Sequence, residues 1–223
     1  MSAMAPSSRA VDTAAVVAMG RSLVLAVLAG AASGFLVAGV GGRLAMRLLA
    51  LTSPEIAQGR LTDDAARVGQ FTVGGSLSLA LALTVIGALL GPVYLLVRRI
   101  LPPSRARRAL GYALLTGVVG GALLVHDHPS FDYSILGPVW LAVALFIAVP
   151  AGYGALTAWL VEVLSRNTGP RLTGPLPRWW RSTPVTIVGV LLYGALVTWG
   201  VYGLLADVVS LASDSASSAP LSL

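Results

Sequence analysis

Two arginine residues stand four positions apart just past the first long apolar stretch, at Arg43 and Arg47. Residues at this spacing lie on the same face of a continuous helix. A guanidinium group forms paired hydrogen bonds with carboxylate or phosphate, so the pair predicts a site for an anion or a lipid headgroup. The alternative interpretation is that both side chains extend to the phosphates of the nearer leaflet without forming a specific site.

Acidic residues follow in the same segment, at Asp63 and Asp64. The sequence Thr62-Asp63-Asp64 is typical of a helix start, with Thr62 as the N-cap and both acids near the positive end of the helix. Local capping therefore accounts for these carboxylates. The alternative is that Asp63 or Asp64 pairs with Arg43 or Arg47 in a polar cluster.

The two histidines of the chain, His126 and His128, lie in one short polar segment with Asp127 and Asp132. Side chains two residues apart point the same way in an extended strand. Imidazole nitrogens and carboxylate oxygens are suitable ligands for a divalent ion, and they can also relay protons. The segment therefore predicts a metal or proton site, or alternatively a solvated loop in which Asp132 caps the following helix.

The elements that must position these side chains are apolar. Hydrophobic residues make up 56% of the 223 residues and charged residues 11%, compared with about a quarter charged in soluble domains. Mean hydropathy is +0.83, and the charges are confined to gaps between long apolar stretches. Since a transmembrane helix needs roughly 20 apolar residues, we predict an all-α integral membrane protein, a five-span helical bundle. The spans are expected at about 22–42, 72–97, 109–125, 135–161 and 183–206.

Arginine distribution predicts the orientation of these spans, because short cytoplasmic loops are enriched in Arg. Segments 98–108 and 166–181 are rich in Arg, whereas 126–132 contains none. We therefore expect the N-terminus inside and the C-terminus outside. The outer face is then expected to gather Arg43, Arg47, the two histidines and a polar cluster of Asp63, Asp64 and Asp132. Tyr94 is assigned to an aromatic belt at the inner interface. Lipid headgroups and topology explain the basic residues, so nucleic acid is excluded as a partner.

Three regions follow from this topology. Residues 1–20 are expected to be a flexible cytoplasmic segment, 21–208 a transmembrane bundle and 209–223 a disordered external tail rich in Ser and Ala. Glu162 and Arg166, four residues apart, are expected to form a structural ion pair. Helix packing relies on small residues in lipid, and such pairs indicate a compact bundle or a homo-oligomer. The pairs are Gly30 and Gly34, Gly87 and Gly91, and Gly117 and Gly121.

Three stretches, 42–50 (GRLAMRLLA), 61–69 (LTDDAARVG) and 140–146 (WLAVALF), resemble segments of small polytopic bacterial membrane proteins of uncharacterised activity. The resemblance would cover much of residues 20–165. It implies the topology and a location in the bacterial cytoplasmic (inner) membrane. It brings no activity, cofactor or catalytic residue.

The sequence contains no nucleotide-binding or hydrolase motif and no Cys, so it assigns neither a catalytic residue nor a cofactor. Short loops favour a non-enzymatic protein within the bilayer, either a subunit of a membrane assembly or a protein that handles a small ligand or lipid. The competing hypothesis is a membrane-embedded enzyme acting on a phosphate-bearing lipid or isoprenoid at the outer leaflet. In that enzyme Arg43 and Arg47 would hold phosphate, and Asp or His would act as acid or base.

Overall fold

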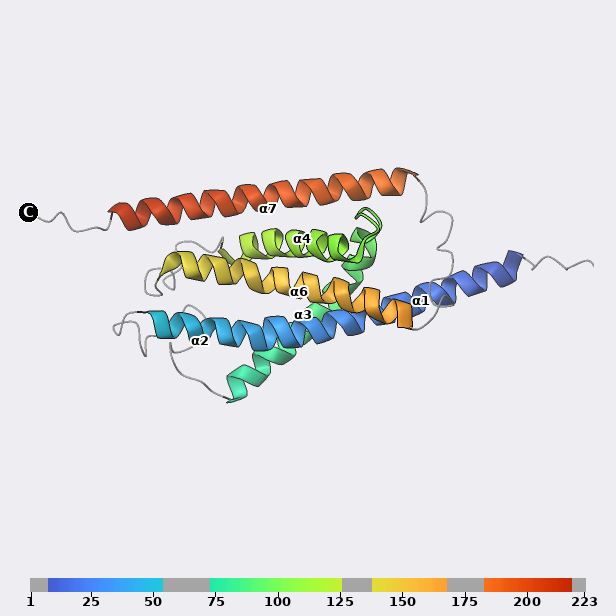
Figure 1. The fold of residues 1–223 in the computed structure, drawn as a ribbon, viewed down its shortest axis with the longest axis horizontal. Coiled ribbons are helices and arrows are strands. Elements are labelled where there is room, and N and C mark those ends of the chain that lie inside the picture. The colour runs from blue at the N-terminus through green and yellow to red at the C-terminus, as the bar shows by residue number, and fades with distance from the viewer. Residues whose placement is uncertain (1–7, 54–72, 126–137, 168–182, 218–223) are drawn as a thin grey trace, which may run out of the picture.

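The computed structural model describes residues 8–53, 73–125, 138–167 and 183–217, and all regular structure within these ranges is helical. Five helical units are long and apolar enough to cross a membrane (Figure 1). The prediction of an all-helical chain with five candidate spans is therefore confirmed. The candidate spans are 16–52, 73–97, 105–125, 139–166 and 186–210.

The first unit consists of α1 (Ser8–Ser33), the π-helix η1 (Gly34–Gly41) and α2 (Gly42–Thr52), which follow one another without a break. Its candidate span has 37 residues, or roughly 55 Å at the α-helical rise, and exceeds the roughly 30 Å of bilayer hydrocarbon. The backbone at Gly42 remains helical, with φ −60° and ψ −41°. Arg43 and Arg47 therefore belong to the same helical unit as the first apolar stretch.

Four further helices complete the described fold: α3 (Val73–Val97), α4 (Arg105–Val125), α6 (Val139–Asn167) and α7 (Thr183–Ser217). Figure 1 shows α1, α4, α6 and α7 running roughly along the long axis of the molecule, whereas α3 crosses them obliquely. The end of α3, the start of α4 and the end of α6 consequently meet at one end of the bundle.

Glycines allow α1 and α3 to bring their backbones into contact. A Cβ atom added at Gly30 would overlap the carbonyl oxygen of Gly87, and one added at Gly91 would overlap that of Ala26. Without a hydrophobic driving force in lipid, such close approach supplies the packing energy. The glycine pairs of the first two spans therefore join two helices of one chain.

The remaining helices pack around this pair. In the α4–α6 contact, Gly117 faces Ala151 and Gly121 faces Ile147. In the α4–α7 contact, Gly200 faces Val118. A buried cluster beside these contacts joins α1, α3, α4 and α6 at one end of the bundle. Its members are Ala26, Ala29, Tyr94, Val97, Tyr112, Leu115, Ala158 and Val161.

Candidate functional site

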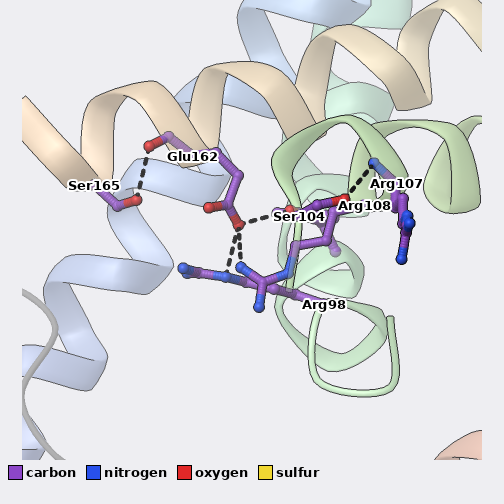
Figure 2. Close-up of polar contacts among 7 residues, drawn as sticks. Arg98, Ser104, Arg107, Arg108, Glu162 and Ser165 are labelled. Atoms are coloured by element: carbon purple, nitrogen blue, oxygen red, sulfur yellow. Dashed lines mark hydrogen bonds and ion pairs between the residues drawn. The ribbon is translucent and has the colours of Figure 1, made fainter. Parts of the chain in front are cut away.

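Glu162 of α6 is buried, with 4% of its surface exposed, and it binds two arginines from other segments. Its Oε1 lies 2.8 Å from Nε of Arg98, which directly follows α3, and 3.1 Å from a terminal nitrogen of Arg108 in α4. Figure 2 shows both guanidinium groups on the same side of the carboxylate. This arrangement, here called the Glu162 cluster, connects three helices at one end of the bundle.

A tyrosine completes the cluster. The hydroxyl of Tyr94 donates a hydrogen bond of 2.9 Å to the same Oε1 atom of Glu162. Tyr94 is fully buried, and its ring lies against that of Tyr112, with centroids 5.1 Å apart. Three donors thus converge on one carboxylate oxygen. Hydrogen bonds to an ionised acceptor are roughly twice as strong as neutral ones, so the carboxylate is firmly held.

Local structure explains how the donors reach Glu162. Tyr94 and Arg98 are four residues apart, as are Arg108 and Tyr112, so each pair shares one helix face. The backbone N–H of Arg98 donates to the carbonyl of Tyr94 at 2.7 Å and extends the turn beyond α3. Ser104 then caps α4, accepting from the backbone N–H of Arg107 at 3.3 Å. The short connection between α3 and α4 therefore places the helix face of Tyr94 and the helix face of Arg108 against α6.

Other tyrosine hydroxyls bond backbone carbonyls across helices. Tyr112 donates to Leu90 at 3.2 Å, and Tyr153 donates to Gly87 at 2.8 Å. A buried hydroxyl without a partner would be costly, so each bond both satisfies the hydroxyl and joins two helices. Tyr193 of α7 likewise donates to the carbonyl of Gly111 in α4 at 2.9 Å.

Positive charge is concentrated at the end of the bundle that holds the Glu162 cluster. Among the described side chains this end has seven arginines and one acid, a net charge of 7 − 1 = +6. Within the described ranges, the buried Nε atom of Arg108 has no hydrogen-bond partner. The arginines are Arg21, Arg98, Arg99, Arg105, Arg107, Arg108 and Arg166.

Arg43 and Arg47 lie at the opposite end of the bundle. Arg43 is partly buried and donates a hydrogen bond to the carbonyl oxygen of Gly75, near the start of α3. Its Nε atom is buried and has no hydrogen-bond partner among the described residues, whereas Arg47 is exposed. Arg43 therefore holds α2 against α3, and its remaining donor leaves the anion-site interpretation open.

The other predicted site residues lie outside the described residues, so the polar cluster and the metal or proton site stay predictions. These residues are Asp63, Asp64, His126, Asp127, His128 and Asp132. Within the described ranges, no group of three or more His, Cys, Asp or Glu side chains could hold a metal ion.

One prediction about an individual ion pair is wrong. Glu162 pairs with Arg98 and Arg108 rather than with Arg166, which is exposed. Tyr94 lies in the last turn of α3, is buried, and bonds Glu162 through its hydroxyl, so its assignment to an interfacial belt stays a prediction. The repeated four-residue spacing of Tyr with Arg, at 94/98 and 108/112, was the available signal for this cluster.

The five long apolar helices indicate a polytopic membrane protein. No family model, no curated protein and no solved structure matches the chain. The resemblance to small bacterial membrane proteins therefore identifies no family.

Proposed function

We propose that this chain is a non-enzymatic, multi-pass subunit of a larger assembly in a bacterial inner membrane, and that the outer face of α7 binds the partner. The observation that carries the proposal is the contrast between the two faces of α7. The arginine-rich end is proposed to face the cytoplasm, in keeping with the enrichment of Arg in cytoplasmic loops.

One face of α7 packs on the bundle. Gly189 lies near Ile100, Gly200 against Val118 and Gly203 near Ala122. In the apolar 18-residue stretch of α7 only 11% is buried inside the protein, compared with 39% in the corresponding stretch of α4. The helix is thus attached along one narrow stripe, and most of its surface contacts lipid or another chain.

The opposite face of α7 is exposed and carries small residues between larger apolar ones such as Leu191, Tyr202 and Leu205. Gly194, Ala195 and Thr198 are all exposed, and a Cβ added at Gly194 would meet nothing within 4 Å. Small residues four apart let transmembrane helices approach closely, and the glycine pairs of α1, α3 and α4 each face a neighbouring helix in this way. This open face therefore fits a transmembrane helix of a partner protein.

The Glu162 cluster supports a non-enzymatic role. A general acid or base must be within reach of a substrate proton, but the buried Glu162 carboxylate already accepts from Tyr94, Arg98 and Arg108. The group consequently acts as a structural connection among three helices.

The test compares two substitutions at open glycines. Gly194→Leu fills the outer face of α7, whereas Gly74→Leu adds the same side chain at the start of α3, where a Cβ also meets nothing within 4 Å. Each variant and the wild type are purified in mild detergent from the native host, and copurifying proteins are quantified by mass spectrometry. A partner should be stoichiometric with the wild type and Gly74→Leu, and reduced at least about tenfold by Gly194→Leu, as expected when a helix contact loses 1.4 kcal/mol or more.

A monomer without a stoichiometric partner would contradict the proposal, as would a partner retained equally by both variants. A second copy of this chain in place of a different protein would make the assembly a homo-oligomer. Crosslinking from Thr198 distinguishes these cases, because it identifies the chain that lies on the open face.

The enzyme hypothesis keeps one supporting observation. The buried Nε of Arg43 has no partner in the part of the chain that the structure describes, which suits an anion at that end of the bundle. Its acid or base would come from Asp63, Asp64, His126 or His128. Loss of lipid phosphate or isoprenoid phosphate turnover in Arg43→Gln would favour this alternative over the subunit function.

A further inference from the structure

We propose that Arg98 and Arg108 of the Glu162 cluster bind the singly charged phosphate group of an anionic membrane lipid. This site is distinct from the outer face of α7 and goes beyond the proposed subunit function. It is argued from the charge balance, the available donors and the position of the cluster.

The charge balance of the cluster leaves one positive charge over. Two guanidinium groups share a single carboxylate, so the cluster carries +1. The Glu162 side chain is 6% exposed, whereas those of Arg98 and Arg108 are 28% and 19% exposed. The negative group is therefore enclosed, and the two positive groups reach the surface. An uncompensated charge next to the apolar core is unfavourable, so a second anion would be stabilised here.

The arginines have donors that Glu162 does not use. A guanidinium group carries five N–H donors in a planar fork. Arg98 gives its Nε–H to Glu162, and Arg108 gives one terminal nitrogen. Within the described part of the chain, the terminal nitrogens of Arg98 and the second terminal nitrogen of Arg108 are not engaged by these bonds. Since both groups lie on one side of the carboxylate (Figure 2), they can form the paired hydrogen bonds that suit a phosphate.

The position of the cluster specifies a lipid as the source of that phosphate. Arg98 follows the last residue of the α3 span, and Arg108 lies in the first turn of α4. Lipid headgroups occupy this depth at the ends of the spans. The partial positive charge at the start of α4 and the net charge of +6 at this end also favour an anion. A phosphodiester with one net negative charge balances the +1 of the cluster, whereas a zwitterionic headgroup brings an ammonium group that the arginines repel.

The experiment measures the melting temperature of the full chain in neutral detergent with added phosphatidylglycerol or phosphatidylcholine. For the wild type, phosphatidylglycerol should raise Tm by about 3 °C more than phosphatidylcholine does. Arg108→Gln should lose most of this difference. Arg107→Gln is the matched control, because it removes the same charge from an exposed side chain one residue away and should keep the difference. Native mass spectrometry of the same samples counts the bound lipids.

Glu162→Gln provides a second, opposite test. The substitution raises the cluster from +1 to +2 and removes the competitor for the guanidinium groups, so the Tm difference between the lipids should persist or increase. A purely structural cluster predicts no preferential loss in Arg108→Gln relative to Arg107→Gln. If Arg108→Gln does not purify, Arg98→Gln tests the same loss, and Glu162→Gln remains informative.

Three outcomes would overturn the inference. Equal loss in Arg107→Gln and Arg108→Gln would mean diffuse attraction to the whole basic end. Loss of the lipid difference in Glu162→Gln would mean that the arginines do not hold the phosphate. An equal rise in Tm with inorganic phosphate in phosphatidylcholine would mean that a soluble anion occupies the site. Retention of the wild-type difference in the presence or absence of inorganic phosphate supports the lipid.

Discussion

The two ends of the bundle hold their arginines in different ways. At one end, donors from α3, α4 and the turn between them converge on the buried carboxylate of Glu162. At the other end, Arg43 donates to the backbone carbonyl of Gly75, and Arg47 is exposed. The described side chains at the Glu162 end have a net charge of +6. At the other end the net charge is 2 − 1 = +1, from Arg43, Arg47 and Asp207.

From this difference we expect that burial of the counter-charge, rather than the number of arginines, decides how strongly a charged residue affects stability. Removing one member of a buried ion pair leaves the remaining charge uncompensated, which costs several kcal/mol. Removing an arginine bonded to a backbone carbonyl loses roughly one hydrogen bond. Substitutions at the two ends should therefore differ in size, and their ranking tests the comparison.

The largest effect is expected for Glu162→Ala. The substitution leaves Arg98 and Arg108 side by side without their carboxylate, and we expect the free energy of unfolding to fall by about 3 kcal/mol. Thermal or denaturant unfolding of the purified protein in detergent measures this loss. Ser165→Ala is the matched control, since it removes only a local bond of 3.2 Å to the backbone carbonyl of Glu162.

Equal losses for Glu162→Ala and Ser165→Ala would break the comparison between the two ends, because the buried carboxylate would then contribute no more than a local hydrogen bond. Glu162→Gln gives an intermediate point. The amide keeps an oxygen that can accept from Tyr94, so we expect part of the loss seen with Ala.

The five candidate spans were predictable from the sequence, but the packing of the helices and the partners of Glu162 were not. Five charge-poor stretches are enough to identify five candidate spans, since the length of an apolar helix is fixed by bilayer thickness. The partners of Glu162 are 64 and 54 residues away, at Arg98 and Arg108 (162 − 98 and 162 − 108). Pairing by proximity selected Arg166, because the crossing of α3, α4 and α6 that sets the true partners is not encoded in local spacing.

The first span shows a similar limit. Gly39, Gly41 and Gly42 stand close together in the first span, yet the helical unit continues to Thr52. Gly39 is buried against Ala80 of α3, so this glycine provides close contact rather than a break. In an apolar environment the backbone groups must remain hydrogen-bonded, which favours a continuous helix. Composition alone could not separate these two uses of glycine.

Tyr94→Phe should have the next largest effect. The substitution keeps the buried ring beside Tyr112 and removes only the hydroxyl that donates to Glu162 at 2.9 Å. A hydrogen bond to a charged group contributes about 1.5 kcal/mol or more, so we expect a loss near that value. Tyr112→Phe is the control, because its 3.2 Å bond goes to a neutral carbonyl and should contribute less. A larger loss in Tyr112→Phe would show that the charge of Glu162 does not strengthen the hydrogen bond from Tyr94.

The smallest effects are expected at the opposite end of the bundle. Arg43→Ala removes the bond to Gly75 and should lower the free energy of unfolding by about 1 kcal/mol. Arg47→Ala, four residues along the same helix and exposed, should change it by less than about 0.5 kcal/mol. Both variants are measured beside Glu162→Ala in the same detergent. If Arg43→Ala matched Glu162→Ala, the buried Nε of Arg43 would have to contact an anionic partner, since one backbone hydrogen bond cannot account for a loss of that size. That result would mean that the charge interaction at the Arg43 end is as strong as that of Glu162, and it would favour the phosphate-binding alternative.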